Sequence, residues 1–224
     1  MRFYKFFSAA ALFLVVTSFV AFVGVTTSRA QSADPQCRVG APPTIEQGPN
    51  FLQKPLGPRL VIACGKSVVG PFEIVAYTGV GHSLCTVFLG SAFGGAECGA
   101  AFHESRLARD GFLVTDTSWA WGGGPGRSYT AIRGWLRPDA ARIEVRYHRK
   151  SEKAITHVNA TVAQVNGELL SALGQTTPFG RFAVVLPGCT VPQGLRVLAF
   201  DSEGRMLGSE RGHKESGPGK PCRH

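Results

Sequence analysis

Short runs of apolar and polar residues alternate from residue 60 onward, and Gly or Pro interrupts each run. A period of two is typical of strands with one buried face, because successive side chains point to opposite faces of a sheet. In residues 141–148, Ile143, Val145 and Tyr147 share one face and charged residues share the other. The predicted strands cover residues 60–64, 72–77, 84–89, 112–114, 129–136, 141–148, 155–162, 182–186, 195–200 and 205–207.

One segment has a helical pattern instead. Residues 167–173 predict a short helix that ends at Gly174. Many short strands with almost no helix favour an all-β fold, because facing antiparallel sheets let every strand bury one side. The sequence therefore predicts one or two antiparallel β-sandwiches with one short helix.

Changes in composition divide the chain into segments. Residues 31–58 are rich in proline and predict an extended arm, whereas residues 209–224 form a polar tail that contains Gly and Pro. The glycine-rich stretch 122–126 suggests a boundary between two parts. On this interpretation residues 59–121 are a β-rich, disulfide-containing part and residues 128–208 are a β-sandwich part.

The last predicted strands carry a resemblance to a known class. The run from Gly180 to Gly188, followed by Leu195 to Asp201, resembles the closing strands of immunoglobulin-like and transthyretin-like sandwich modules in exported bacterial proteins. The resemblance implies an immunoglobulin-like sandwich. Modules of this kind serve in adhesion, carbohydrate binding or scaffolding, so it also implies a binding or structural role without catalytic residues.

The first thirty residues predict a signal peptide. Two basic residues precede a long uncharged run, and Ser28-Arg29-Ala30 places small residues at the positions that a signal peptidase reads. The apolar run from Ala9 to Val25 has 17 residues, close to the ~17–25 that span a bilayer, so an uncleaved membrane anchor is the alternative. In both cases the rest of the chain is expected outside the cytoplasm, secreted or anchored.

All six cysteines lie beyond this leader, and an even number in an exported chain predicts disulfides. Sequential pairing is expected, since short loops close at the lowest entropic cost. Cys85 and Cys98 also flank a predicted hairpin with a glycine-rich turn over residues 90–99. The predicted disulfides are Cys37–Cys64, Cys85–Cys98 and Cys189–Cys222.

The net charge of the chain limits the classes of binding partner that are expected. Without the three basic residues of the leader, 21 Lys and Arg face 15 Asp and Glu, a formal charge of +6. A moderately basic surface favours an anionic polymer of the cell envelope, and another exported protein is the alternative. The sequence contains no block of basic residues interleaved with aromatics, so nucleic-acid binding is not predicted. A membrane is a partner only if the leader is retained. No metal or other cofactor motif is present in the sequence.

One motif suggests catalysis. Gly81-His82-Ser83-Leu84-Cys85 resembles the Gly-x-Ser-x-Gly elbow of α/β-hydrolases, which would make Ser83 a nucleophile. Cys85 replaces the second glycine and a predicted strand follows, so a hairpin turn is favoured and a secreted serine hydrolase is the alternative. On that alternative the base would be one of His148, His157 and His213, oriented by one of Asp110, Asp116 and Asp139.

Four aromatic residues between positions 119 and 135 form the candidate ligand-binding site. Exposed rings would make a stacking platform for sugars or apolar ligands, whereas a sandwich core would bury them. These residues are Trp119, Trp121, Tyr129 and Trp135.

The sequence thus predicts an exported, disulfide-stabilised, non-enzymatic protein that binds or scaffolds at the cell envelope. Besides the hydrolase, a second alternative is the extracytoplasmic domain of a membrane-anchored sensor or regulator.

N-terminal sequencing of the exported protein tests the leader. Cleavage after Ala30 would give a chain that begins at Gln31. A chain that retains residues 1–30 would instead support the anchor.

Overall fold

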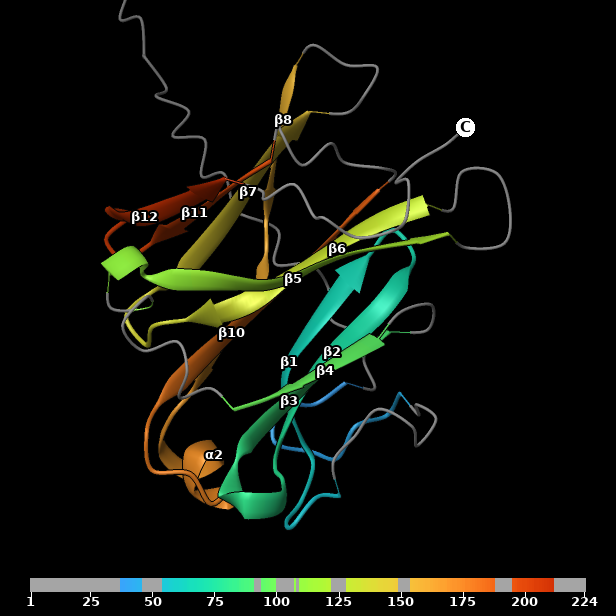
Figure 1. The fold of residues 1–224 in the computed structure, drawn as a ribbon, viewed down its shortest axis with the longest axis vertical. Helices are drawn as coiled ribbons and strands as arrows, with labels where there is room; N and C mark the ends of the chain where they lie inside the picture. Colours follow the sequence, from blue (N-terminus) through green and yellow to red (C-terminus); the bar gives the residue numbers. More distant parts are fainter. Residues whose placement is uncertain are drawn as a thin grey trace, which may run out of the picture.

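The structure, a computed structural model, describes residues 37–45, 54–90, 94–99, 107, 109–121, 128–148, 154–187 and 195–211, with only the backbone for residues 113–121 and 128. Twelve strands in this part of the chain form three four-stranded antiparallel sheets (Figure 1). The prediction of an antiparallel, mostly β fold is therefore confirmed.

Sheet A has the strand order β1-β2-β3-β4. Its strands are β1 (Leu60–Ser67), β2 (Gly70–Thr78), β3 (Leu84–Gly90) and β4 (Gly94–Cys98). The prediction of a turn over all of residues 90–99 is wrong, because β4 pairs with β3. Glycine lowers the apparent strand propensity of β4, but the ladder to β3 supplies its backbone hydrogen bonds.

Sheet B has the order β5-β6-β10-β9. Its strands are β5 (Phe112–Trp121), β6 (Ser128–Leu136), β10 (Phe179–Pro187) and β9 (Thr161–Val165). The predicted boundary at 122–126 falls between β5 and β6, which pair with each other. Residues 112–121 therefore belong with the second part of the chain rather than the first.

Sheet C has the order β12-β11-β7-β8. Its strands are β12 (Met206–Arg211), β11 (Arg196–Phe200), β7 (Arg142–His148) and β8 (Ile155–Asn159). The predicted single strand 155–162 is wrong, because the chain leaves sheet C after Asn159 and enters sheet B at Thr161. The side chains of Val158, Ala160 and Val162 nevertheless pack toward the same core.

Sheet B is the central layer, and Figure 1 shows sheets A and C on its two sides. Strand β10 explains why, since its successive side chains enter different cores. Phe182, Val184 and Leu186 pack against sheet C, whereas Ala183 and Val185 pack against sheet A. Each large apolar side chain buried in this way contributes about 1.5–3 kcal/mol.

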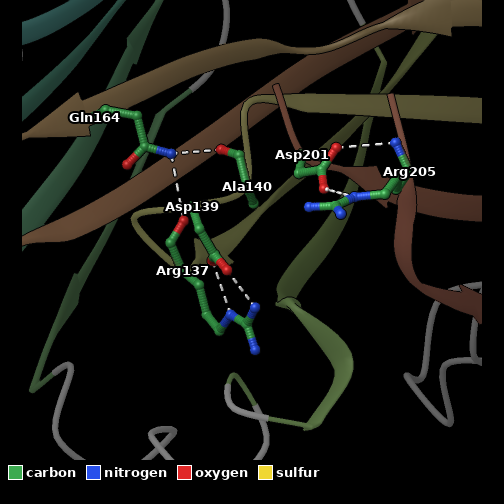
Figure 2. A network of polar contacts seen from close by, with 6 residues as sticks. All are labelled: Arg137, Asp139, Ala140, Gln164, Asp201 and Arg205. Atoms are coloured by element: carbon green, nitrogen blue, oxygen red, sulfur yellow. Dashed lines mark hydrogen bonds and ion pairs between the residues drawn. The ribbon is translucent and has the colours of Figure 1, made fainter. Parts of the chain in front are cut away.

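A corner joins sheets B and C, where the chain crosses between them twice. The side chain of Gln164 in β9 donates hydrogen bonds to the carbonyl oxygens of Ala140, at 2.5 Å, and Arg137, at 3.3 Å. These two residues lie in the β6–β7 turn, where Asp139 also accepts from the Arg137 guanidinium. Figure 2 shows this turn beside the Asp201–Arg205 ion pair of the β11–β12 turn.

The outer face of sheet A is covered by residues 37–45. The Cys37–Cys64 disulfide fixes this arm, and its Gly40 and Ala41 form backbone hydrogen bonds with Val61. Glu73 in β2 is only 1% exposed, and its carboxylate accepts hydrogen bonds from the arm. The donors are the Thr44 hydroxyl at 2.6 Å, the Thr44 amide at 3.0 Å and the Ile45 amide at 3.3 Å.

The predicted short helix is confirmed as α2 (Gly167–Ala172). Leu170 and Leu173 bury its apolar side against sheets A and B. The Thr78 hydroxyl donates to the Leu173 carbonyl at 2.5 Å, and Gly174 follows with a φ of 65°, a conformation that ends helices at low cost.

The disulfides Cys37–Cys64 and Cys85–Cys98 are both formed, with Cα–Cα distances of 6.1 and 4.0 Å. They indicate an oxidising, extracytoplasmic environment. Cys189, Cys222 and the predicted leader lie outside the described residues. Helices in the described part of the chain are too short or too polar to cross a bilayer.

We expect Glu73→Gln to release the arm. The variant replaces one acceptor oxygen with an amide that faces the N–H donors of residues 44 and 45, so urea unfolding should show a loss of about 1–3 kcal/mol. Glu168→Gln removes a charge from the exposed first turn of α2 and should cost less, at most the few tenths of a kcal/mol of a weak helix-dipole contact. Equal stability of all three proteins would contradict the role of Glu73.

Candidate functional site

The structure does not build a nucleophile elbow around Ser83. The residue follows the 3₁₀ turn Val80–His82 and precedes β3, whereas the elbow requires a strand followed by a helix. Its hydroxyl donates to the Val80 carbonyl at 3.1 Å, and Cys85 is held in a disulfide. In Figure 1 this turn lies next to α2, and β7 and β8, which carry two of the candidate bases, reach toward the opposite end of the molecule. His213 lies outside the described residues.

Two of the four aromatic candidates are in the core. Tyr129 is 2% exposed and Trp135 is 1% exposed, and both pack between sheets A and B. An exposed stacking platform therefore cannot include these two rings, because β6 places them on its inner face. The side chains of Trp119 and Trp121 lie outside the described residues.

The outer face of sheet C carries a different group of polar residues. Arg142, Glu144, Arg146 and His148 alternate with buried residues along β7, as the sequence pattern predicts. Residues directly opposite one another in antiparallel strands point to the same face, so the pairing of β7 with β8 and β11 extends this surface. It includes His157 from β8 and Arg196 from β11.

Four of these positions form a line across all four strands. Arg196 lies opposite Arg146 in β7 and opposite Arg211 in β12, and Arg146 in turn lies opposite His157. We call these four residues the basic row. Since neighbouring strands are about 4.8 Å apart, the backbone positions of the row span roughly 14 Å.

Glu144 lies two residues before Arg146 on the same face of β7, and its carboxylate contacts two members of the basic row. Its carboxylate accepts from Arg146 Nε at 2.6 Å and Arg142 Nη1 at 3.0 Å, and lies 2.8 Å from His157 Nδ1. Burial alone would raise the pKa of Glu144, but the hydrogen bonds from Arg146, His157 and Arg142 outweigh it and lower the pKa to about 2. Glu144 is therefore ionised at any physiological pH.

Arg142 is further fixed by an aromatic ring. Its guanidinium carbon lies 3.8 Å from the centroid of the Phe200 ring, opposite it on β11. Leu198, at the centre of the outer face, is only 6% exposed. The apolar stems of neighbouring arginines are well suited to cover such a residue, leaving their charged ends in water.

The outer face has four arginines and two histidines but one carboxylate among its described side chains. Arg146, Arg196 and Arg211 stand side by side, and directly opposed like charges destabilise a sheet. Glu144 neutralises only one charge of the group. The arrangement is thus electrostatically costly for the isolated protein and favourable for an extended anion.

Metal chemistry receives no support from the histidines of this face. His148 lies opposite Ile155 rather than opposite His157. The described residues contain no group of three His, Cys, Asp or Glu arranged to hold a metal ion.

Comparisons of the chain with protein-family models, curated proteins and solved structures found no match. A functional proposal therefore rests on the geometry of the chain itself.

Sequence reasoning identified half of the basic row. The alternation in residues 141–148 placed Arg146 on an outer face, and His157 entered only as a candidate base. Arg196 and Arg211 gave no local signal, because their alignment with Arg146 depends on the strand order of sheet C.

Glu144 should make stability depend on pH at acidic values. Its folded-state pKa of about 2 lies below the ordinary 4.5, so its contribution is present above about pH 4.5 and disappears as the pH falls toward 2. We expect the wild type to lose on the order of 1–2 kcal/mol more than Glu144→Gln over this range, measured by chemical unfolding. Glu203→Gln, at an exposed ion pair, should follow the wild type. Parallel curves for wild type and Glu144→Gln would contradict this effect.

Proposed function

We propose that this protein is an exported, non-enzymatic binding module that attaches to an anionic polymer of the cell envelope through the outer face of sheet C. The observation that carries the proposal is the basic row, in which three arginines stand directly opposite one another with one neighbouring carboxylate. A protein tolerates such repulsion where a ligand relieves it.

The shape of the surface favours a polymer over a small anion. Its three arginines and His157 lie along a line of roughly 14 Å across the sheet rather than converging on one point. Arginine guanidiniums match the geometry of phosphate and carboxylate groups, so successive anionic groups of one chain would meet successive strands. Arg196 and Arg211 are exposed, and the side chains of Arg146 and His157 are 39% and 53% exposed.

Export and the sandwich type belong to the same proposal. The disulfides Cys37–Cys64 and Cys85–Cys98 support delivery to an oxidising compartment by the predicted signal peptide. The face-to-face packing of sheets B and C supports an immunoglobulin-like sandwich within residues 112–211.

The test is binding to immobilised long-chain polyphosphate, with dextran as the uncharged matrix. Arg196→Gln/Arg211→Gln should weaken binding by at least about tenfold at low salt and reduce its salt dependence, because each lost contact releases fewer counterions. Both side chains are exposed, so folding should be unaffected.

The matched control is Arg38→Gln/Arg59→Gln, which removes the same charge from exposed positions outside sheet C. This variant should bind as the wild type does. An equal loss of binding in both double variants would attribute the affinity to net charge alone and refute a site on sheet C.

A further inference from the structure

A polar cluster interrupts the otherwise apolar core between sheets A and B. Arg181 in β10 is 3% exposed and lies opposite Trp135 of β6, with its guanidinium carbon 4.1 Å from the ring centroid. From sheet A, Glu97 in β4 approaches Arg181 Nη2 at 3.3 Å. Thr86 in β3 lies opposite Glu97 and between two residues that face sheet B.

Several donors in this cluster have no acceptor. Arg181 Nε, Arg181 Nη1, Trp135 Nε1 and Thr86 Oγ1 are all buried without a hydrogen-bond partner. A buried donor without an acceptor costs stability, and native proteins contain few of them. Four such atoms within one short segment of an interface therefore point to an acceptor that binds there.

The charge of the cluster indicates what the acceptor is. Burial lowers the pKa of Arg181 to about 10, and Glu97 only partly offsets this effect. The nearby Arg133 adds a second guanidinium, which also disfavours the charge on Arg181. The carboxylate beside Arg181 belongs to Glu97, whose side chain is 26% exposed. The positive charge of Arg181 is thus incompletely compensated.

The close packing of β4 limits the size of a ligand. A Cβ atom at Gly95 would lie 1.8 Å from Arg133 Nη1, so the β4 backbone rests directly on that guanidinium. Trp135 and Thr86 are 1% and 2% exposed. Such close packing excludes a ligand with bulky substituents.

We propose that a small monovalent anion, of the size of a halide or formate, binds between sheets A and B and accepts hydrogen bonds from Arg181, Trp135 and Thr86. A water molecule donates two of its hydrogens and adds no charge, so it would leave the excess of donors and of positive charge in place. This site is separate from the basic row, which lies on the other side of sheet B.

The first experiment measures the Tm of the disulfide-bonded chain in sodium chloride, sodium formate and sodium gluconate at equal ionic strength. Binding to the folded state should raise the Tm with the logarithm of chloride or formate concentration. Gluconate, which is too large for the site, should have no such effect. The stronger of the two small ions identifies the preferred class. The same Tm in all three salts would overturn the proposal.

The variant Thr86→Val should shift the Tm in opposite directions in the absence and in the presence of the anion. It keeps the shape of the side chain but removes one donor, so it should weaken the apparent affinity for the anion about tenfold. In gluconate it should raise the Tm, because an unpaired buried hydroxyl is lost, and in saturating chloride or formate it should lower the Tm. Thr156→Val, the same change in β8 of sheet C, should shift the Tm equally in all salts. Stabilisation by Thr86→Val in every salt would refute an anion at this position.

A direct measurement completes the test. Crystals grown with bromide in place of chloride should give an anomalous difference peak between Arg181 and Thr86. A peak only elsewhere, or none, would overturn the site.

Discussion

The two-sided burial of sheet B is the constraint on which the rest of the structure depends. A strand that alternates between two cores cannot leave either face in water, so β10 requires one sheet on each side. Sheet A supplies one cover and sheet C the other. The two outer faces of these covers differ among the described residues: the arm of residues 37–45 covers that of sheet A, whereas that of sheet C presents the basic row.

The same constraint separates what the sequence predicted from what it did not. The local hydrophobic pattern was sufficient to predict most strands and α2, because a half-buried element shows the period of its structure in its own residues. Pairing of Cys37 with Cys64 and of Cys85 with Cys98 followed from short loops. The division at Ala160 was missed, because the apolar period continues through it while the hydrogen-bonding partner changes from β7 to β10.

Candidate sites were harder to predict for a related reason. Trp135 and Tyr129 have the composition of a binding platform, yet β6 turns them into the core, where one of them stacks on Arg181. The basic row exists only once four strands from distant parts of the chain are ordered. Glu73 likewise appeared as an unremarked residue in a strand, although its carboxylate holds the arm through Thr44 and Ile45. Function and stability here depend on register, which a single sequence does not state.

The corner between sheets B and C has a mechanical consequence. Two of the three crossings between these sheets, through the β6–β7 turn and through Ala160, occur there, and Gln164 ties the first of them to β9. The Ala160 amide also bonds to the Ile143 carbonyl at 2.9 Å. A pull exerted on sheet C by anything attached to its surface would thus travel into sheet B along covalent backbone at that corner. The connection from β10 to β11 is a third covalent link between the two sheets, so a load on sheet C would also reach sheet B through it.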